Sequence, residues 1–204
     1  MATDTMFTYQ VSDHALGRIL PQRLGRALWL PMLVMALMAF AVGFVLAIVR
    51  ADAIASGGAI STIAALNHSV PGFMFLGFAA VFAAISFAIA RILGEFRVGG
   101  GSVQEAVGGE VHTLTMPRTA KLFVAGMVLA MMTLVAAVVL HFVAAAAIAG
   151  GSATALGNAE TWATQLEGVR RAGIALYLFA ITLGLASIVE VLRFQASRMR
   201  ELAA

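Results

Sequence analysis

The sequence of 204 residues contains no cysteine and few charged residues. Without cysteine the chain forms no disulfide, offers no thiolate to a metal and has no cysteine nucleophile. Charged residues make up 11% of the chain, against about a quarter in soluble domains. Hydrophobic residues make up 61%, and the mean hydropathy is +0.96. These proportions exclude an ordinary soluble domain and indicate a membrane protein with little mass outside the lipid.

Long apolar runs occupy most of the chain. Four of them are each about as long as the roughly 20 residues that a helix needs to cross bilayer hydrocarbon. They are residues 27–49, 72–92, 121–149 and 171–193. We therefore predict an all-α fold: a polytopic membrane protein with one membrane domain, residues 1–204, in which four transmembrane helices form an antiparallel bundle with short loops.

Basic residues are distributed unevenly between the two sides of this four-span arrangement. Ten Lys or Arg side chains flank the spans on the side that holds both termini and the loop 94–120, and three lie on the other side. Because cytoplasmic loops carry the Lys and Arg excess, we predict that both termini and residues 94–120 are cytoplasmic. The first run is too long for a signal-peptide core, so we expect it to remain as a span.

The basic character of the chain has a second interpretation, nucleic-acid binding, because the pI is near 10.2. The basic side chains, however, are dispersed at helix ends instead of gathering on one face, so topology explains them better and we expect no nucleic-acid partner. All of them except Lys121 are arginines, a bias typical of GC-rich bacterial genomes. We therefore expect a bacterial inner (plasma) membrane protein.

Small residues recur at helical spacing within each run, and this spacing keeps them on one side of a helix. Membrane helices associate through such small residues, so the sequence predicts that these stripes are packing faces, and that partner subunits use them. The stripes are Ala36, Ala39, Gly43 and Ala47; Gly77, Ala80, Ala84 and Ala88; Ala130, Thr133, Ala137, His141 and Ala144; and Gly173, Tyr177, Ala180, Gly184 and Ser187.

His141 is the single ionisable side chain between Leu122 and Ala149. A buried imidazole or phenol needs a partner in hydrocarbon. Counted from Arg171 as a helix end, Tyr177 lies at a depth similar to that of His141, which favours an interhelical hydrogen bond from His141 to Tyr177, or else to a serine. The alternative is that His141 ligates haem b together with His68, or contacts a quinone head group. The candidate cofactor-binding residues are therefore His141, His68 and Tyr177.

Glu190 lies near the cytoplasmic end of the fourth run, one helical turn before Arg193 and at a depth similar to that of Lys121. We interpret these three residues as an intramembrane ion pair that anchors helix ends. A proton-relay carboxylate is the alternative, because ionisable groups within the membrane are often functional.

The loop 94–120 contains the pair Gly108-Gly109 between residues 102–107 and 110–116, both of which resemble strands. A two-glycine connection of this kind predicts a β-hairpin.

Motifs of nucleotide binding, of zinc hydrolases and of acid–base carboxylate pairs do not occur in the sequence. We therefore expect neither an enzyme nor a metal-binding protein, but a non-catalytic integral membrane subunit or accessory protein of a larger complex. Its expected contacts are the lipid bilayer and either partner subunits or further copies of the chain. Two alternatives stay open: a haem b- or quinone-binding subunit of an electron-transfer complex, and a small proton-coupled transporter that uses Glu190 and His141.

Overall fold

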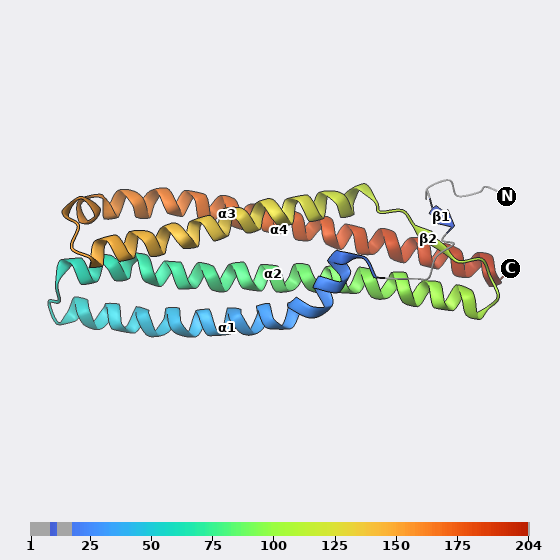
Figure 1. Ribbon diagram of the computed structural model, residues 1–204, viewed down its shortest axis with the longest axis horizontal. Helices are drawn as coiled ribbons and strands as arrows, with labels where there is room; N and C mark the ends of the chain where they lie inside the picture. Colours follow the sequence, from blue (N-terminus) through green and yellow to red (C-terminus); the bar gives the residue numbers. More distant parts are fainter. Residues whose placement is uncertain (1–8, 12–17, 204) are drawn as a thin grey trace. The chain divides into compact units, whose positions relative to one another are not determined.

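A computed structural model describes residues 9–11 and 18–203, and Figure 1 labels their helices and strands. The described part of the chain contains four long helices, and each is long and apolar enough to cross a membrane. The predicted all-α fold with four membrane-spanning helices is therefore confirmed. In chain order the elements are β1 Tyr9–Val11, α1 Leu20–Ala55, α2 Ile60–Ala106, β2 His112–Leu114, α3 Arg118–Ala149 and α4 Ala153–Ala203.

The helices are longer than the apolar runs that predicted them. At 1.5 Å per residue, the 47 residues of α2 and the 51 residues of α4 give lengths of about 70 Å and 77 Å. Bilayer hydrocarbon is only about 30 Å thick, so both helices continue well beyond the span that their apolar residues require. The predicted loop 94–120 is wrong over its first half, because α2 continues to Ala106. Three consecutive glycines there lower the helix propensity of the segment. Gly100, however, packs closely against the Gln195 side chain, and this packing outweighs the low propensity.

Three of the helices end in the same backbone motif. At the end of α1, Gly57 has a φ of 68° and its N–H donates to the Ile54 carbonyl, while the N–H of Gly58 donates to the Ala53 carbonyl. This is a Schellman motif, in which a glycine in the left-handed region satisfies the last carbonyls of the helix. The ends of α2, at Gly108 with a φ of 72°, and of α3, at Gly151 with a φ of 81°, repeat it.

Two helix starts, those of α4 and α1, are capped by side chains. The hydroxyl of Ser152 accepts a hydrogen bond of 3.2 Å from the N–H of Ala155, as a serine N-cap does. At the start of α1 the Gln22 side chain reaches back and accepts a 3.1 Å hydrogen bond from the N–H of Ile19. Such caps explain why α4 begins at Ala153, well before the fourth apolar run.

The predicted hairpin is wrong, although one of its strands is present. Residues 102–106 are helical, and β2 pairs instead with β1 as an antiparallel two-stranded ribbon in which Gln10 faces Thr113. The physical reason is that Gly108 adopts a positive φ in a helix C-cap, and a hairpin turn places the same demand on a glycine.

The chain divides into two compact units, and every helix contributes to both. Unit 1 comprises Met1–Trp29, Ile85–Gly126 and Phe179–Ala204, and unit 2 comprises Leu30–Ala84 and Met127–Leu178. In unit 2 a core forms around Tyr177 and Leu134, which are both fully buried.

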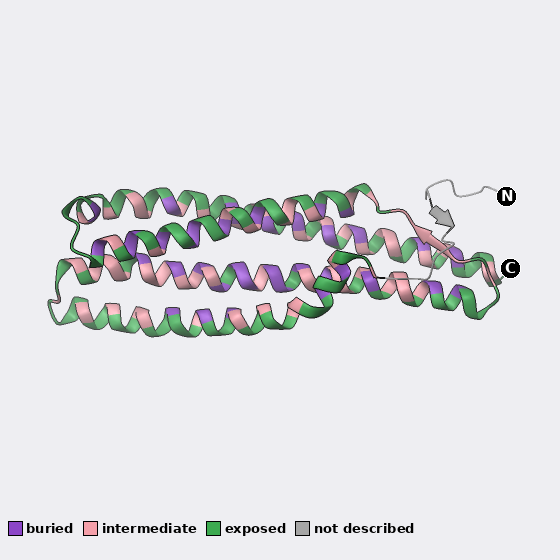
Figure 2. Cartoon of the chain, in the orientation of Figure 1, coloured by how far each residue is buried: buried purple, intermediate pink, exposed green. Residues whose placement is uncertain are grey.

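The small-residue stripes are buried against other helices of the same chain. A Cβ added to Gly77 would lie 2.6 Å from the ring of Phe40, and one added to Gly173 would lie 2.6 Å from Leu134. Buried positions recur along one face of each helix (Figure 2). The stripes are thus packing faces as predicted, but they are not free surfaces for a partner.

The opposite faces expose large apolar side chains. On α1, Leu37 is 64% exposed and Phe44 is 67% exposed. Only 17% of the most apolar window of α1 is buried, against 44% for α2. Apolar area on this scale is favourable in lipid and costly in water, so these faces contact the bilayer.

Candidate functional site

The candidate site lies in unit 2 and is built around two histidines from neighbouring helices. His68 comes from α2 and His141 from α3, and their side chains are almost completely shielded, with 1% and 2% of each residue exposed. The ring centroids lie 5.6 Å apart, and the ring planes make an angle of 51°. We call these two residues the histidine pair.

One hydrogen bond fixes the tautomer of His68. Its Nε2 lies 3.1 Å from the carbonyl oxygen of Ala159 in α4. A carbonyl oxygen can only accept, so Nε2 carries a proton, and in the neutral ring Nδ1 then carries the lone pair. That Nδ1 atom is buried and has no hydrogen-bond partner among the described residues. His68 therefore presents an unused acceptor within the packed helices.

The ring of His141 has neither of its nitrogens paired. Both Nδ1 and Nε2 are buried without a hydrogen-bond partner in the described part of the chain. Burying a polar group without a hydrogen bond costs roughly 1–3 kcal/mol in proteins, and native structures rarely tolerate it. The histidine pair thus brings three buried ring nitrogens without partners together, and a ligand bound there would satisfy them.

An aromatic ring and a cation lie next to the pair. The Phe75 ring stacks near His141 at a centroid distance of 6.2 Å, and the guanidinium carbon of Arg170 lies 3.8 Å from the centroid of the same phenyl ring. Glu167 pairs with both Arg170 and Arg171 on α4. This local group therefore has one carboxylate for two guanidinium groups and remains positively charged.

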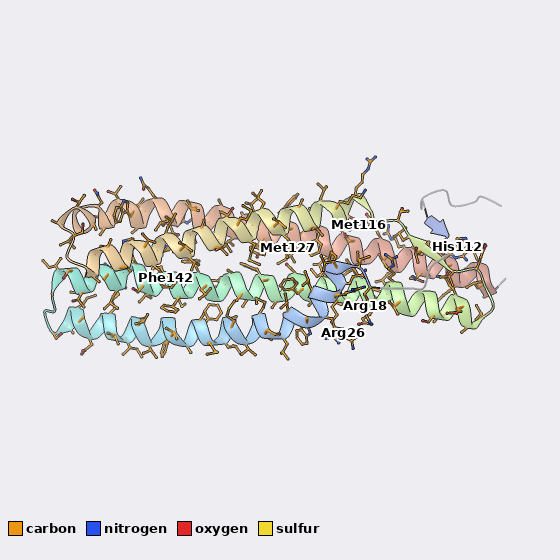
Figure 3. All side chains as sticks on the ribbon, in the orientation of Figure 1. Arg18, Arg26, His112, Met116, Met127 and Phe142 are labelled. Atoms are coloured by element: carbon orange, nitrogen blue, oxygen red, sulfur yellow. The ribbon has the colours of Figure 1, made fainter. Side chains whose placement is uncertain are left out.

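Close packing limits the size of any ligand beside the pair. Gly72 follows His68 by one helical turn, and a Cβ added there would lie 3.1 Å from the Phe142 ring and 3.3 Å from the Cβ of His141. Phe142, labelled in Figure 3, also packs edge-on against Phe73 at 4.9 Å. At this level α2 and α3 are in van der Waals contact, which leaves no slot for a haem macrocycle between them.

Tyr177 is not the partner of His141. Its hydroxyl donates to the sulfur of Met131 at 3.2 Å, and its ring stacks on Phe82 at 5.2 Å. The predicted hydrogen bond is wrong because the depth of Tyr177 was counted from Arg171 as a helix end, whereas α4 begins at Ala153. Met131 precedes His141 by ten residues, or about 15 Å of helix.

The predicted ion pair at Glu190 is also not formed. In unit 1 the Glu190 carboxylate accepts a 3.0 Å hydrogen bond from the hydroxyl of Thr119, and it makes no ion pair with Arg193 or Lys121 among the residues that the structure describes. The Ser187 hydroxyl lies 3.0 Å from that of Thr119. Glu190 and His141 belong to different units.

Two neighbours of the histidine pair escaped the sequence analysis. Phe75 belongs to an ordinary apolar run, and Arg170 was counted only among the three basic residues on the side opposite the termini. The spacing of Glu167 and Arg170, three residues apart, was an available signal of helix at that point.

Known proteins offer no guide to this site. Comparison of the chain with family models, with curated proteins and with solved structures gave no match. The function must therefore be argued from the geometry of the chain itself.

Proposed function

We propose that this chain is a non-catalytic integral membrane subunit and that, contrary to the expectation from the sequence, it holds a transition-metal ion at the histidine pair. The observation that carries the proposal is the pair itself: two fully buried imidazoles, close together, with unpaired nitrogens. Imidazole is a ligand suited to zinc, copper, iron and nickel.

The separation of the two rings favours a bridging ion over a direct hydrogen bond. A metal–nitrogen bond is about 2.0–2.1 Å, so two imidazoles on one ion have centroids roughly 5 Å apart at a tetrahedral angle and roughly 6.3 Å apart when linear. A direct N–H···N hydrogen bond of about 3 Å gives centroids no more than roughly 5.2 Å apart. The observed 5.6 Å falls within the first range, and the two rings make no hydrogen bond to each other.

The hydrogen bond from His68 to Ala159 supports the same proposal. Metal-ligating histidines donate their other ring N–H to a carbonyl or carboxylate, which fixes the ring and increases its basicity as a ligand. His68 has this arrangement, with Nε2 engaged and Nδ1 available. Among the described residues no third His, Cys, Asp or Glu joins the pair. The remaining coordination positions would take a small exogenous ligand, and an anionic one would offset the positive charge of the metal ion and of the neighbouring Arg170.

The alternatives are less well supported. Haem b needs α2 and α3 to separate at Gly72, where they are in contact. A quinone head group needs a similar opening. The proton-coupled transporter depends on Glu190, whose carboxylate is engaged by Thr119.

Metal analysis of the purified chain tests the proposal. The protein is reconstituted in nanodiscs after chelation, supplied with Zn²⁺ or Cu⁺ separately, and its bound metal is measured. We expect one ion per chain, with affinity lowered at least about tenfold in His68→Gln and His141→Gln. His112→Gln, a substitution in unit 1, serves as the control and retains the ion. Absence of stoichiometric metal from the wild type, or equal binding by all three variants, contradicts the proposal.

Membership of a larger complex is the second part of the proposal. The small-residue stripes are buried within the chain, so a partner subunit would contact exposed apolar faces such as that of α1. Native mass spectrometry of the tagged chain, released from its own membrane in mild detergent, tests this part. A reproducible adduct with another protein chain or a second copy supports it, and a bare monomer contradicts it.

The orientation completes the proposal: an inner-membrane protein with both termini and the end of α2 in the cytoplasm. Cysteine labelling tests the orientation. Because the chain has no cysteine of its own, a single introduced cysteine is the only thiol that can be labelled. Ser56 and Ser102 are both exposed. In spheroplasts an impermeant maleimide should label Ser56→Cys directly and Ser102→Cys only after permeabilisation, and the reverse pattern inverts the topology.

A further inference from the structure

Unit 1 contains a largely apolar cavity of about 110 Å³. Its walls come from the start of α1, the second half of α2, β2 and the residues after it, the start of α3 and the end of α4. Phe123 and Phe194 supply broad aromatic surface, and Ala90 and Ala120 leave space by their small size. An engineered apolar cavity of about 150 Å³ holds a benzene molecule, so this one fits a short segment of alkyl chain.

Of the described side chains that line the cavity, Arg97 alone has a buried polar atom without a hydrogen-bond partner. The Gln22 oxygen accepts from Ile19, the amide of Gln195 donates to the Phe96 carbonyl at 3.4 Å, and Ser187 Oγ lies 2.9 Å from the Leu183 carbonyl. Arg97 differs. Its Nε is shielded from solvent without a hydrogen-bond partner, and Arg97 makes no ion pair with any described residue.

The surrounding charge favours an anion. Among the described residues of unit 1, ten are basic and five are acidic. Of the carboxylates, Glu95 pairs with Arg18, Glu201 with Arg198, and Glu190 accepts from Thr119. The other two carboxylates, Glu105 and Glu110, do not line the cavity, so the cavity wall itself carries no acidic side chain. An excess of positive charge raises the local concentration of anions.

We infer that this cavity binds an anionic lipid of the surrounding bilayer, with its phosphate on the Arg97 guanidinium and the adjoining alkyl segment in the cavity. Arginine binds phosphate in a bidentate manner, and basic pockets between transmembrane helices are suited to lipid head groups. Leu122 and Leu192, which neighbour the lining residues Phe123 and Val191 in the sequence, are large, apolar and exposed, and offer the lipid tails a surface to follow. This inference concerns unit 1 and does not depend on the histidine pair.

Lipid binding to the purified chain tests the inference. Native mass spectrometry compares retention of phosphatidylglycerol, which is anionic, with that of phosphatidylcholine, which has no net charge. A further arm uses oleate, which has an alkyl chain and a carboxylate but no phosphate. We expect retained phosphatidylglycerol, and a loss of at least about tenfold in affinity for it in Arg97→Gln, because hydrogen bonds to charged groups contribute on that scale.

Two further variants separate the site from general electrostatics. Arg200→Gln removes the same charge from an exposed position of unit 1 and should leave binding unchanged. Ala90→Leu fills the cavity wall without altering charge and should weaken phosphatidylglycerol binding while circular dichroism stays unchanged. The inference is overturned if Arg97→Gln and Arg200→Gln weaken binding equally, if phosphatidylcholine is retained as well as phosphatidylglycerol, or if only oleate binds.

Discussion

The imidazole rings of His68 and His141 are held 5.6 Å apart by the packing of their helices, since Gly72 brings α2 against the Cβ of His141 one turn beyond His68. The same turn of α2 therefore carries a histidine of the site and the contact that sets its spacing. Other glycines of α2 also pack closely against neighbouring helices, and alanine substitutions there measure how much this packing contributes to stability.

Gly77→Ala should destabilise the protein. A Cβ at this position would lie 2.6 Å from the Phe40 ring, which itself packs edge-on against Phe78 at 5.2 Å. Overpacking of this kind costs about 1–3 kcal/mol. Gly99→Ala in the same helix meets no atom within 4 Å and should stabilise by roughly 0.5–1 kcal/mol through helix propensity alone. Reversible unfolding in mixed detergent measures both, and a shift of the same sign in both variants contradicts the prediction.

The ring of Tyr177 should matter far more than its hydroxyl. The side chain is fully buried and stacks on Phe82, whereas its hydroxyl donates to a sulfur, which is a weak acceptor. Tyr177→Phe should therefore cost less than about 1 kcal/mol, and Tyr177→Ala about 3–5 kcal/mol. The same unfolding assay measures the difference. A larger loss in Tyr177→Phe than in Tyr177→Ala would show that the hydroxyl has another role.

Helix formation and packing faces were predictable because bilayer physics acts on sequence directly. Length, apolarity and small-residue period identified the four helices and the stripes that Ala36, Ala80, Ala130 and Ala180 now mark as buried. The partner of His141 was not predictable in this way, since it depends on the register between α3 and α4. That register followed from the helix start capped by Ser152, which lies among small polar residues that resembled a loop.

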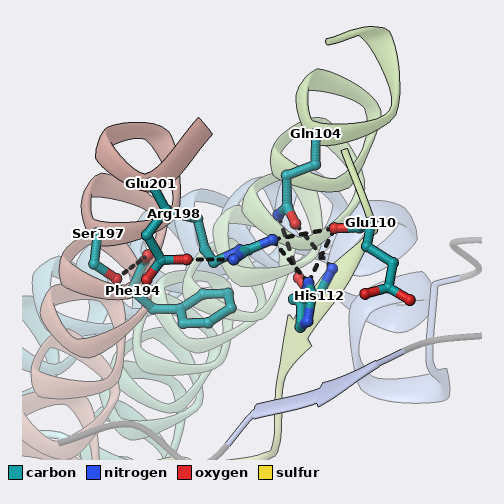
Figure 4. Close-up of polar contacts among 7 residues, drawn as sticks. All are labelled: Gln104, Glu110, His112, Phe194, Ser197, Arg198 and Glu201. Atoms are coloured by element: carbon teal, nitrogen blue, oxygen red, sulfur yellow. Dashed lines mark hydrogen bonds and ion pairs between the residues drawn. The ribbon is translucent and has the colours of Figure 1, made fainter. Parts of the chain in front are cut away.

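The strand at residues 112–114 shows the same limit. Its extended character was visible in the sequence, but a glycine with positive φ serves a helix cap and a hairpin equally well. Side-chain contacts favour the observed arrangement: the Gln104 side chain binds the backbone of His112, eight residues on, and Arg198 contacts Glu110 from the far end of α4 (Figure 4). The contact of Arg198 cannot be read from the local sequence.

Gln104 should control the stability of β2. Its side chain, 2% exposed, accepts a 2.8 Å hydrogen bond from the His112 N–H and donates a 3.2 Å hydrogen bond to the His112 carbonyl (Figure 4). Two hydrogen bonds contribute about 1–3 kcal/mol, so amide exchange at His112 should accelerate roughly tenfold to a hundredfold in Gln104→Leu. Gln104→Glu keeps the acceptor and loses the donor, so the exchange rate at His112 should lie between those of the wild type and Gln104→Leu.

Hydrogen exchange followed by mass spectrometry or NMR measures this effect. Ser102→Ala on the same helix removes an exposed hydroxyl bonded to Val98 and is the matched control. Arg198 Nη2 also contacts His112 Nδ1 at 2.7 Å, so the strand should loosen without detaching. If the amide exchange rate at His112 is unchanged in Gln104→Leu, the Gln104 hydrogen bonds do not hold β2 in place, and Arg198 alone does.

The contact between Arg18 and Glu95 should make stability depend on pH. Glu95 lies beyond the second apolar run, 72–92, and its carboxylate accepts a 2.9 Å hydrogen bond from Arg18 Nη2. That hydrogen bond lowers the pKa of Glu95 from its ordinary value, and the charges of Arg18, Arg26 and Arg91 act in the same direction. Because the folded-state pKa is depressed, the stabilisation is present above the pKa of the unfolded chain and is lost as the pH falls through the folded-state pKa.

Melting temperatures measured against pH for wild type and Glu95→Gln test this dependence. The wild type should melt at the higher temperature near pH 7, and the two curves should converge as the pH falls below the folded-state pKa of Glu95. Glu105→Gln, which neutralises an exposed carboxylate of the same helix that makes no ion pair with a described residue, should keep the pH profile of the wild type. Parallel curves for wild type and Glu95→Gln over the whole range would mean that the contact between Arg18 and α2 is maintained by packing and not by charge.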